Sequence, residues 1–172
     1  MNNKRHTVWN LAVITVMLSF PVAEANDAAT VTEQMAGLQT MCADTDQARA
    51  QRQAENALYN RLGGYDRIHE FTREVVRLHK QNDAIKHMFE HVDAEHLAKS
   101  VADFVASGTG GPQSYAGRAM PAVHARLELT DADFLSAGGD IVTAMQSMGY
   151  GQNEIDEMVC ILVSLKGQVI FE

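Results

Sequence analysis

The sequence of 172 residues is poor in basic residues and has no basic tract. It contains 14 Lys and Arg against 22 Asp and Glu, which gives a formal net charge of −8. Nucleic acids and anionic membrane surfaces attract proteins through clusters of Lys and Arg. The shortage therefore predicts that neither nucleic acid nor an anionic membrane is a partner.

Cysteine is also scarce, because the chain has only Cys42 and Cys160. The C-x-x-C-H motif of covalent haem attachment is absent. In an oxidising compartment the two cysteines can form a disulfide, and the alternative is two separate small hydrophobic residues. The sequence leaves both alternatives open.

No stretch alternates apolar and polar residues with period two for long enough to predict a strand. Apolar residues instead recur every three or four positions, as on the buried face of a helix. With 46% hydrophobic residues, the chain can build one domain with a real core. The predicted class is all-α, with helices around residues 68–78, 97–105, 134–148 and 155–162.

The N-terminus has the pattern of a secretory signal peptide. Lys4 and Arg5 precede an apolar run at 8–20, and an A-x-A site follows at 23–25. The alternative is an uncleaved membrane anchor, but the run is shorter than the about 20 residues of a spanning helix. Removal of residues 1–25 is therefore predicted, together with a periplasmic or secreted location and no membrane attachment after cleavage.

Two parts follow the signal peptide. Residues 26–56 form an N-terminal extension that we expect to be partly helical, because an apolar stripe at helical spacing runs from Val31 to Cys42. This stripe would lay one helix against the body of the protein. Residues 57–172 form the domain itself.

A single histidine, His124, lies between two helix signals. Pro121 suits the first turn of a helix, and Thr130 with Asp133 has the pattern of the N-cap of the next one. His124 therefore belongs to a short helix that is not stable alone and must be held by something it packs on or binds. Taken by itself, such a histidine is more often a hydrogen-bonded core or surface residue than a ligand.

From residue 58 to about 170 the chain resembles the truncated haemoglobins, and among them group I. The resemblance rests on LYNRLGG at 58–64, Met88-Phe89, GGP at 110–112 and YAGRAMPAVHARLELTDADF at 115–134. The family's glycine landmarks correspond to Gly63-Gly64, Gly110-Gly111 and Gly117. The resemblance implies a truncated globin fold, a 2-over-2 sandwich of four helices around a b-type haem.

By the family's pattern, His124 is the proximal ligand of the haem iron. A neutral imidazole is a good axial ligand, and its second ring nitrogen needs an acceptor such as a carbonyl to fix the ring's orientation. Phe89 matches the phenylalanine that packs on the porphyrin face. An ordinary core aromatic would also suit its position.

On the distal side, the chain departs from the family. Group I members commonly hydrogen-bond iron-bound oxygen with a tyrosine and a glutamine, and the spacing places Val76 and Val101 at those positions. Leu97 falls at the distal gate and Val75 where the family often has phenylalanine, so the expected pocket is apolar. Each lost hydrogen bond to a charged acceptor is worth roughly 1.5–3 kcal/mol. We therefore expect weaker, faster-released oxygen, with smaller effects on nitric oxide and carbon monoxide.

Other polar residues are candidates for haem contacts. Several family members bind the iron a second time with a histidine of the distal helix, and its position corresponds to Ser100 here. Three nearby histidines are candidates for a sixth ligand, with a solvated role as the alternative: His96 first, then His87 and His91. Tyr115 and Lys99 could reach the haem propionates, although plain surface exposure would explain Lys99 equally well.

The resemblance implies a globin that reversibly binds a diatomic gas, namely oxygen, nitric oxide or carbon monoxide. Oxidation of nitric oxide, a dioxygenase-type activity that needs a reductase of unknown identity, is a further expectation. Two alternatives stay open. One is a six-coordinate haem protein for electron transfer or weak peroxidase chemistry, and the other is a helical scaffold that has lost haem.

Overall fold

The computed structural model describes residues 28–171, so the predicted signal peptide at 1–25 lies outside the described residues. Every regular element in the described range is helical: α1 (Ala28–Asp44), α2 (Asp46–Glu55), α3 (Leu58–Arg61), α4 (Gly64–His79), η1 (Lys86–Phe89), α5 (Ala94–Gly108), α6 (Met120–His124), α7 (Asp131–Ser147), α8 (Gln152–Leu165) and η2 (Lys166–Gln168). None of these helices is long and apolar enough to cross a membrane.

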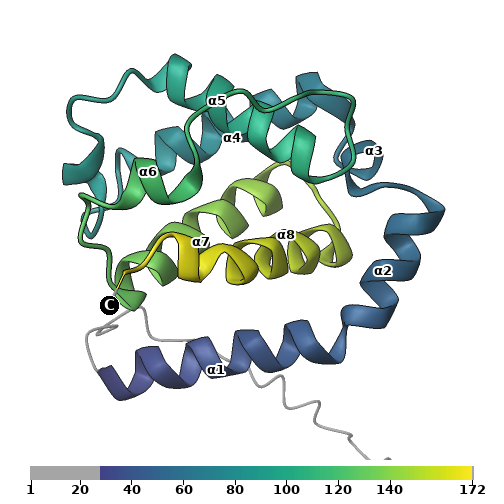
Figure 1. The fold of residues 1–172 in the computed structure, drawn as a ribbon, viewed down its shortest axis with the longest axis horizontal. Helices are drawn as coiled ribbons and strands as arrows, with labels where there is room; N and C mark the ends of the chain where they lie inside the picture. Colours follow the sequence, from purple (N-terminus) through teal and green to yellow (C-terminus); the bar gives the residue numbers. More distant parts are fainter. Residues whose placement is uncertain (1–27, 172) are drawn as a thin grey trace, which may run out of the picture.

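Two helix pairs form the body of the molecule. α4 packs on α5 in one layer, α7 packs on α8 in the other, and α4 also contacts α7 (Figure 1). Three fully buried alanines on α5 leave room for the large side chains around them: Ala98, Ala102 and Ala106. The core between the layers includes Ile68, Phe71, Met145, Ile155 and Met158. This arrangement confirms the predicted all-α class and its two layers of two helices.

Local signals in the sequence set where the helices begin. Thr130 and Asp133 form a capping box at the start of α7, as the sequence predicts. The Asp93 carboxylate accepts a hydrogen bond from the backbone N–H of His96, 2.9 Å away, at the start of α5. Pro121 lies in the first turn of α6. These caps satisfy backbone donors that a helix leaves unpaired at its N-terminus.

The N-terminal extension is joined to the body by a disulfide between Cys42 in α1 and Cys160 in α8. Their Cα atoms are 5.4 Å apart, although the residues are separated by 118 positions in the sequence. Of the two alternatives for the cysteines, the structure therefore shows the bridge. It fixes α1 along α7 and α8, where α1 covers one side of the sandwich (Figure 1).

A buried ion-pair network joins the extension to the body a second time. Glu157 of α8 is only 5% exposed, and its carboxylate accepts from Arg52 Nε of α2 at 2.6 Å and from Arg61 of α3. Arg61 also donates to Glu154 at 2.8 Å. Burial alone would lower the pKa of Arg61, but the hydrogen bonds from its guanidinium to Glu157 and Glu154 outweigh this and raise the pKa. α2 is therefore held on α8 by paired charges.

A cavity of about 450 Å³ lies between α1, α7 and α8. Apart from Gln34, its lining is apolar, and three of the lining residues are glycines within helices: Gly37, Gly138 and Gly139. A Cβ atom added at any of these glycines would have no neighbour within 4 Å. The space therefore exists partly because these three positions carry no side chain.

We expect Gly37→Ala and Gly139→Ala each to raise the free energy of unfolding by about 0.5–1 kcal/mol. Alanine restricts the unfolded chain and favours the helix, and neither position has a neighbour to clash with. Urea unfolding measures the change. Gly111→Ala is the matched opposite, because its Cβ would lie 2.5 Å from Tyr59 Cδ2 and 2.7 Å from the Ala106 carbonyl oxygen. Equal effects at all three glycines would contradict this account.

The double variant Cys42→Ala/Cys160→Ala is expected to unfold about 2–5 kcal/mol more easily than the wild type, because the bridge limits a loop of more than a hundred residues in the unfolded chain. Urea unfolding under oxidising conditions measures this loss. Dithiothreitol should produce a similar loss in the wild type and none in the variant. A wild-type midpoint that is insensitive to the reductant would show that the bridge does not stabilise the fold.

Candidate functional site

The geometry of His124 suits a metal ligand. His124 is the last residue of α6, is half-buried, and its Nδ1 atom lies 2.8 Å from the carbonyl oxygen of Met120. Because a carbonyl oxygen can only accept, Nδ1 carries the proton of the neutral ring and donates it. The lone pair of the neutral imidazole is then on Nε2. The hydrogen bond thus fixes both the orientation of the ring and the nitrogen that is free to bind a metal.

The segment before α6 is held in a defined path. The Tyr115 ring packs edge-on against Phe104, with ring centroids 5.2 Å apart, and the Tyr115 hydroxyl donates to the carbonyl of Arg118 at 2.9 Å. A Cβ atom at Gly117 would lie 2.4 Å from the Tyr115 ring, so any larger residue would displace this ring. The third glycine landmark thus lets Tyr115 fold back over the chain that leads to His124.

The second wall of the candidate site is the corner formed by η1. Phe89 is the last residue of this short 3₁₀ helix and is partly buried. Its ring lies against the imidazole of His79, the last residue of α4, with ring centroids 5.2 Å apart. Lys80 Nζ donates to the carbonyls of Phe89 at 2.9 Å and Val92 at 3.1 Å. The ring contact with His79 and the hydrogen bonds from Lys80 therefore hold this corner against the end of α4.

His79 belongs to a polar cluster that the sequence analysis missed. Its Nδ1 lies 2.9 Å from Asp140 Oδ2 of α7. Asn82 Nδ2 contacts the same Asp140 oxygen and Ser136 Oγ, both at 2.9 Å. The helical spacing from Thr72 to His79 places His79 on the buried face of α4, and this was the available signal. Its partner on α7 lies 61 residues away and carries no such signal.

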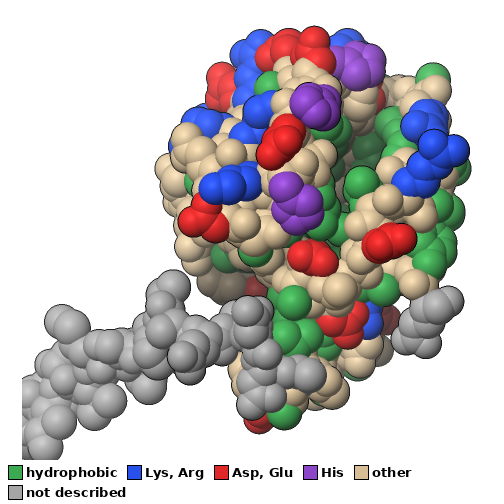
Figure 2. Space-filling view, turned by 90° about the vertical axis from the view of Figure 1, so that its left-hand side faces the viewer, with side chains coloured by type: hydrophobic (Ala, Val, Ile, Leu, Met, Phe, Trp, Pro, Cys, Tyr) green, Lys and Arg blue, Asp and Glu red, His purple; other side chains and the backbone are tan. Residues whose placement is uncertain are grey.

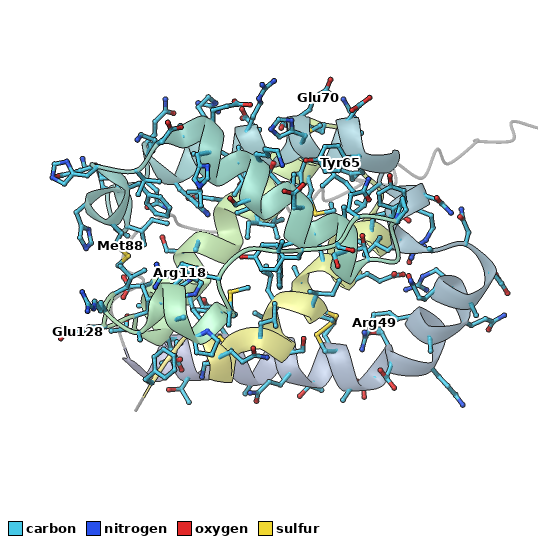
Figure 3. All side chains as sticks on the ribbon, turned by 45° about the horizontal axis from the view of Figure 1, so that its top comes forward. Arg49, Tyr65, Glu70, Met88, Arg118 and Glu128 are labelled. Carbon is cyan, nitrogen blue, oxygen red and sulfur yellow. A yellow bond between two sulfur atoms is a disulfide. The ribbon has the colours of Figure 1, made fainter. Side chains whose placement is uncertain are left out.

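η1 and α6 lie at the same end of the molecule (Figure 1). Seen from this end, the surface has a hollow with hydrophobic side chains at its bottom, histidines along one side and Lys and Arg on the other (Figure 2). Met88 of η1, Arg118 before α6 and Glu128 after it lie at this end, and Arg49 lies at the opposite one (Figure 3). The structure thus brings the two segments that carry Phe89 and His124 to one end.

The predicted distal residues lie on α4 and α5. Val76 is buried, whereas Leu97 and Val101 are partly buried. Val76 borders a groove of about 510 Å³ between α4 and the first turn of α5, whose other walls include Arg73 and Glu95. These two side chains pair through two hydrogen bonds of 2.9 and 2.7 Å, which lower the pKa of Glu95. Charged side chains thus border Val76 on this side, and the apolar distal pocket stays a prediction.

The remaining candidates have other partners or are exposed. Lys99 is 62% exposed and donates to Asp103 Oδ2 at 2.8 Å, and the Tyr65 hydroxyl donates to the same carboxylate. These contacts lower the pKa of Asp103, with Lys99 as the larger cause. The three candidate sixth ligands are all exposed: His87, His91 and His96. A haem contact for any of these residues stays a prediction, as it does for Tyr115.

The comparison that decides the family covers the part of the chain that contains these elements. A family model described as bacterial-like globin matches residues 57–171. The chain belongs to the bacterial-like globins. This membership confirms the resemblance to truncated haemoglobins and implies a haem-binding globin, in a family that generally binds diatomic gases.

Relatives support the same assignment. The chain is 25% identical over 105 residues to the group 1 truncated hemoglobin of Tetrahymena thermophila, which covers 61% of this chain and 87% of the relative. The truncated hemoglobin of Tetrahymena pyriformis, solved in its Fe(III) form, superposes with a TM-score of 0.65 at 20% identity, over 68% of this chain and 100% of the other. This second likeness shows the 2-over-2 fold.

A third similar protein is the 2/2 hemoglobin from Synechococcus sp. PCC 7002, solved in the cyanomet state with covalently attached heme. Its TM-score is 0.62 at 25% identity, over 66% of this chain and 98% of the other. The family match begins at residue 57, so α1 and α2 precede the matched region. Both helices therefore lie outside the part of the chain that the family model matches.

Proposed function

We propose that this globin holds a b-type haem through His124 and reversibly binds a diatomic gas. The observation that carries the proposal is the hydrogen bond between His124 Nδ1 and the Met120 carbonyl, which leaves Nε2 as the free acceptor. Haem would supply an iron atom with one open position for oxygen, nitric oxide or carbon monoxide. Phe89 would face the macrocycle from the opposite segment, and Tyr115 would lie near its polar edge.

The choice of gas depends on the donors near the open position. In the proposed pocket, Val76, Leu97 and Val101 have no side-chain donor, so oxygen would gain no hydrogen bond there. Nitric oxide and carbon monoxide need such a donor less. We therefore infer that oxygen binds with a fast off-rate and that discrimination against carbon monoxide is poor.

An exported location is part of the proposal. Its support is the signal-peptide pattern in residues 1–25 together with the disulfide between Cys42 and Cys160, since disulfides persist in oxidising compartments and are rare in the cytosol. Dioxygenation of nitric oxide there would require a reductase partner outside the cytosol. Gas binding itself requires only that the iron stay ferrous.

His124→Ala is expected to abolish haem retention, because the variant loses the nitrogen that would bind the iron from α6. The absorption spectrum of the purified ferrous protein measures this: the wild type should show a Soret band of a five-coordinate high-spin haem. Added imidazole should restore part of the band in the variant, because it replaces the missing ligand.

His96→Ala is the matched control for the ligand assignment. His96 is exposed and lies outside α6, so its replacement should leave the Soret band unchanged. Full haem retention in His124→Ala would refute the assignment of His124. A low-spin wild-type spectrum that becomes high-spin in His96→Ala would show that His96 is a sixth ligand, and would favour the six-coordinate alternative over reversible gas binding. A wild-type protein without any Soret band would refute haem binding.

Val76→Tyr is expected to lower the oxygen dissociation rate of the ferrous protein by about 10- to 100-fold. The added hydroxyl would donate to bound oxygen, and such a bond is worth roughly 1.5–3 kcal/mol. Stopped-flow displacement of oxygen by carbon monoxide measures the rate. Val76→Phe is the control, because it adds the same ring without the hydroxyl at this buried position. Equal rates in the two variants would show that residue 76 does not face the bound gas.

A further inference from the structure

We propose that the end of α4 and the residue that follows it clamp Phe89 in position, with His79 holding its ring and Lys80 its backbone. We propose further that this clamp controls how firmly haem is retained. The inference rests on the proposed function, because Phe89 faces haem only if haem is bound. His79 and Lys80 are positioning residues, since they act on haem through Phe89. Neither residue is among those that the resemblance assigned to the haem.

Phe89 needs such a clamp because its own helix is too short to fix it. η1 has four residues, and 3₁₀ helices of this length are not stable alone. The ammonium of Lys80 donates to the carbonyls of Phe89 and Val92, so a single charge holds both ends of the turn that follows η1. Hydrogen bonds with a charged donor are stronger than neutral ones.

His79 supplies the second half of the clamp. It is 8% exposed and its ring lies 5.2 Å from that of Phe89, with 36° between the ring planes. Asp140 fixes the imidazole at Nδ1, and Asn82 and Ser136 continue this chain of hydrogen bonds. Because Asp140 and Ser136 belong to α7, the position of the Phe89 ring is tied to both layers of the sandwich.

Each contact in this cluster restricts the rotation of a side chain or of a peptide group. Asp140 restricts the imidazole, the imidazole restricts the Phe89 ring, and Lys80 restricts the peptide that carries the ring. A porphyrin that packs against a fixed ring binds more tightly than one that packs against a mobile ring, because binding orders less of the pocket. Affinity differences between closely related complexes appear mainly in the dissociation rate. The lifetime of bound haem should therefore depend on residues in the end of α4 and in α7.

The test compares haem loss in variants of the clamp. His79→Ala removes ring and hydrogen bond together, and transfer of ferric haem to excess apomyoglobin should become about tenfold faster, the upper range for a single aromatic contact. His79→Phe keeps a ring but loses Asp140, and should lie between His79→Ala and the wild type. Lys80→Met changes an exposed side chain and should also speed the transfer.

His69→Ala is the matched control. His69 lies on the same helix, but its Nε2 is 3.3 Å from a carboxylate oxygen of Glu95 on α5 and its ring neighbour is Tyr65 of α4. Its haem transfer rate should stay within twofold of the wild type. Rates in His79→Ala and Lys80→Met that equal the His69→Ala rate would overturn the clamp.

A second readout needs no haem. In the apoprotein, hydrogen exchange at the backbone amides of Met88 and Val92, which donate to Ile85 and Phe89, should speed up in His79→Ala and Lys80→Met but not in His69→Ala. Faster exchange at these amides in a chain that never binds haem would leave the clamp standing and refute the proposed function. Unchanged exchange in both clamp variants would refute the clamp, whatever the chain binds.

Discussion

The wall of the candidate site that carries His124 depends on a helix that is too short to be stable alone. α6 has five residues, fewer than an isolated helix needs for stability, yet it carries the one histidine that the proposed function requires. Pro121 presets its first turn, and the Tyr115 ring holds the chain that enters it. Within α6, the bond from His124 to the Met120 carbonyl joins the last side chain to the first residue. The ring is thus oriented by its own helix, and the position of that helix is set by its neighbours.

The opposite wall is supported in a different way. η1 has four residues, one fewer than α6, but the Phe89 ring packs on His79 of α4, which Asp140 of α7 holds in turn. The ammonium of Lys80 donates hydrogen bonds to this segment, and the His79 ring packs against that of Phe89. The His124 ring is therefore oriented within its own helix, whereas the support of Phe89 extends from His79 to Asp140, 61 positions away.

This difference explains what could be predicted from the sequence. The caps at Asp93 and Thr130 and the apolar periodicity of the long helices involve residues a few positions apart, so the helices were predictable. His124 became a ligand candidate only through the family's motifs, since its local pattern also fits an ordinary histidine. The pairs His79–Asp140 and Arg52–Glu157 join residues 61 and 105 positions apart, and one sequence contains no sign of such partners. The distal side is the least determined, because apolar residues fit a gas pocket and a helix interface equally well.

The bridge between Cys42 and Cys160 gives the chain a topology that a simple globin lacks. The disulfide and the backbone between its two cysteines form a closed covalent ring. Every candidate haem contact from Val76 to His124 lies in the backbone segment of this ring. When such a chain unfolds, the two walls of the site remain parts of one loop and cannot drift as far apart as in a linear polymer. Unfolding would then leave the segments that carry Phe89 and His124 close enough to find each other again during refolding.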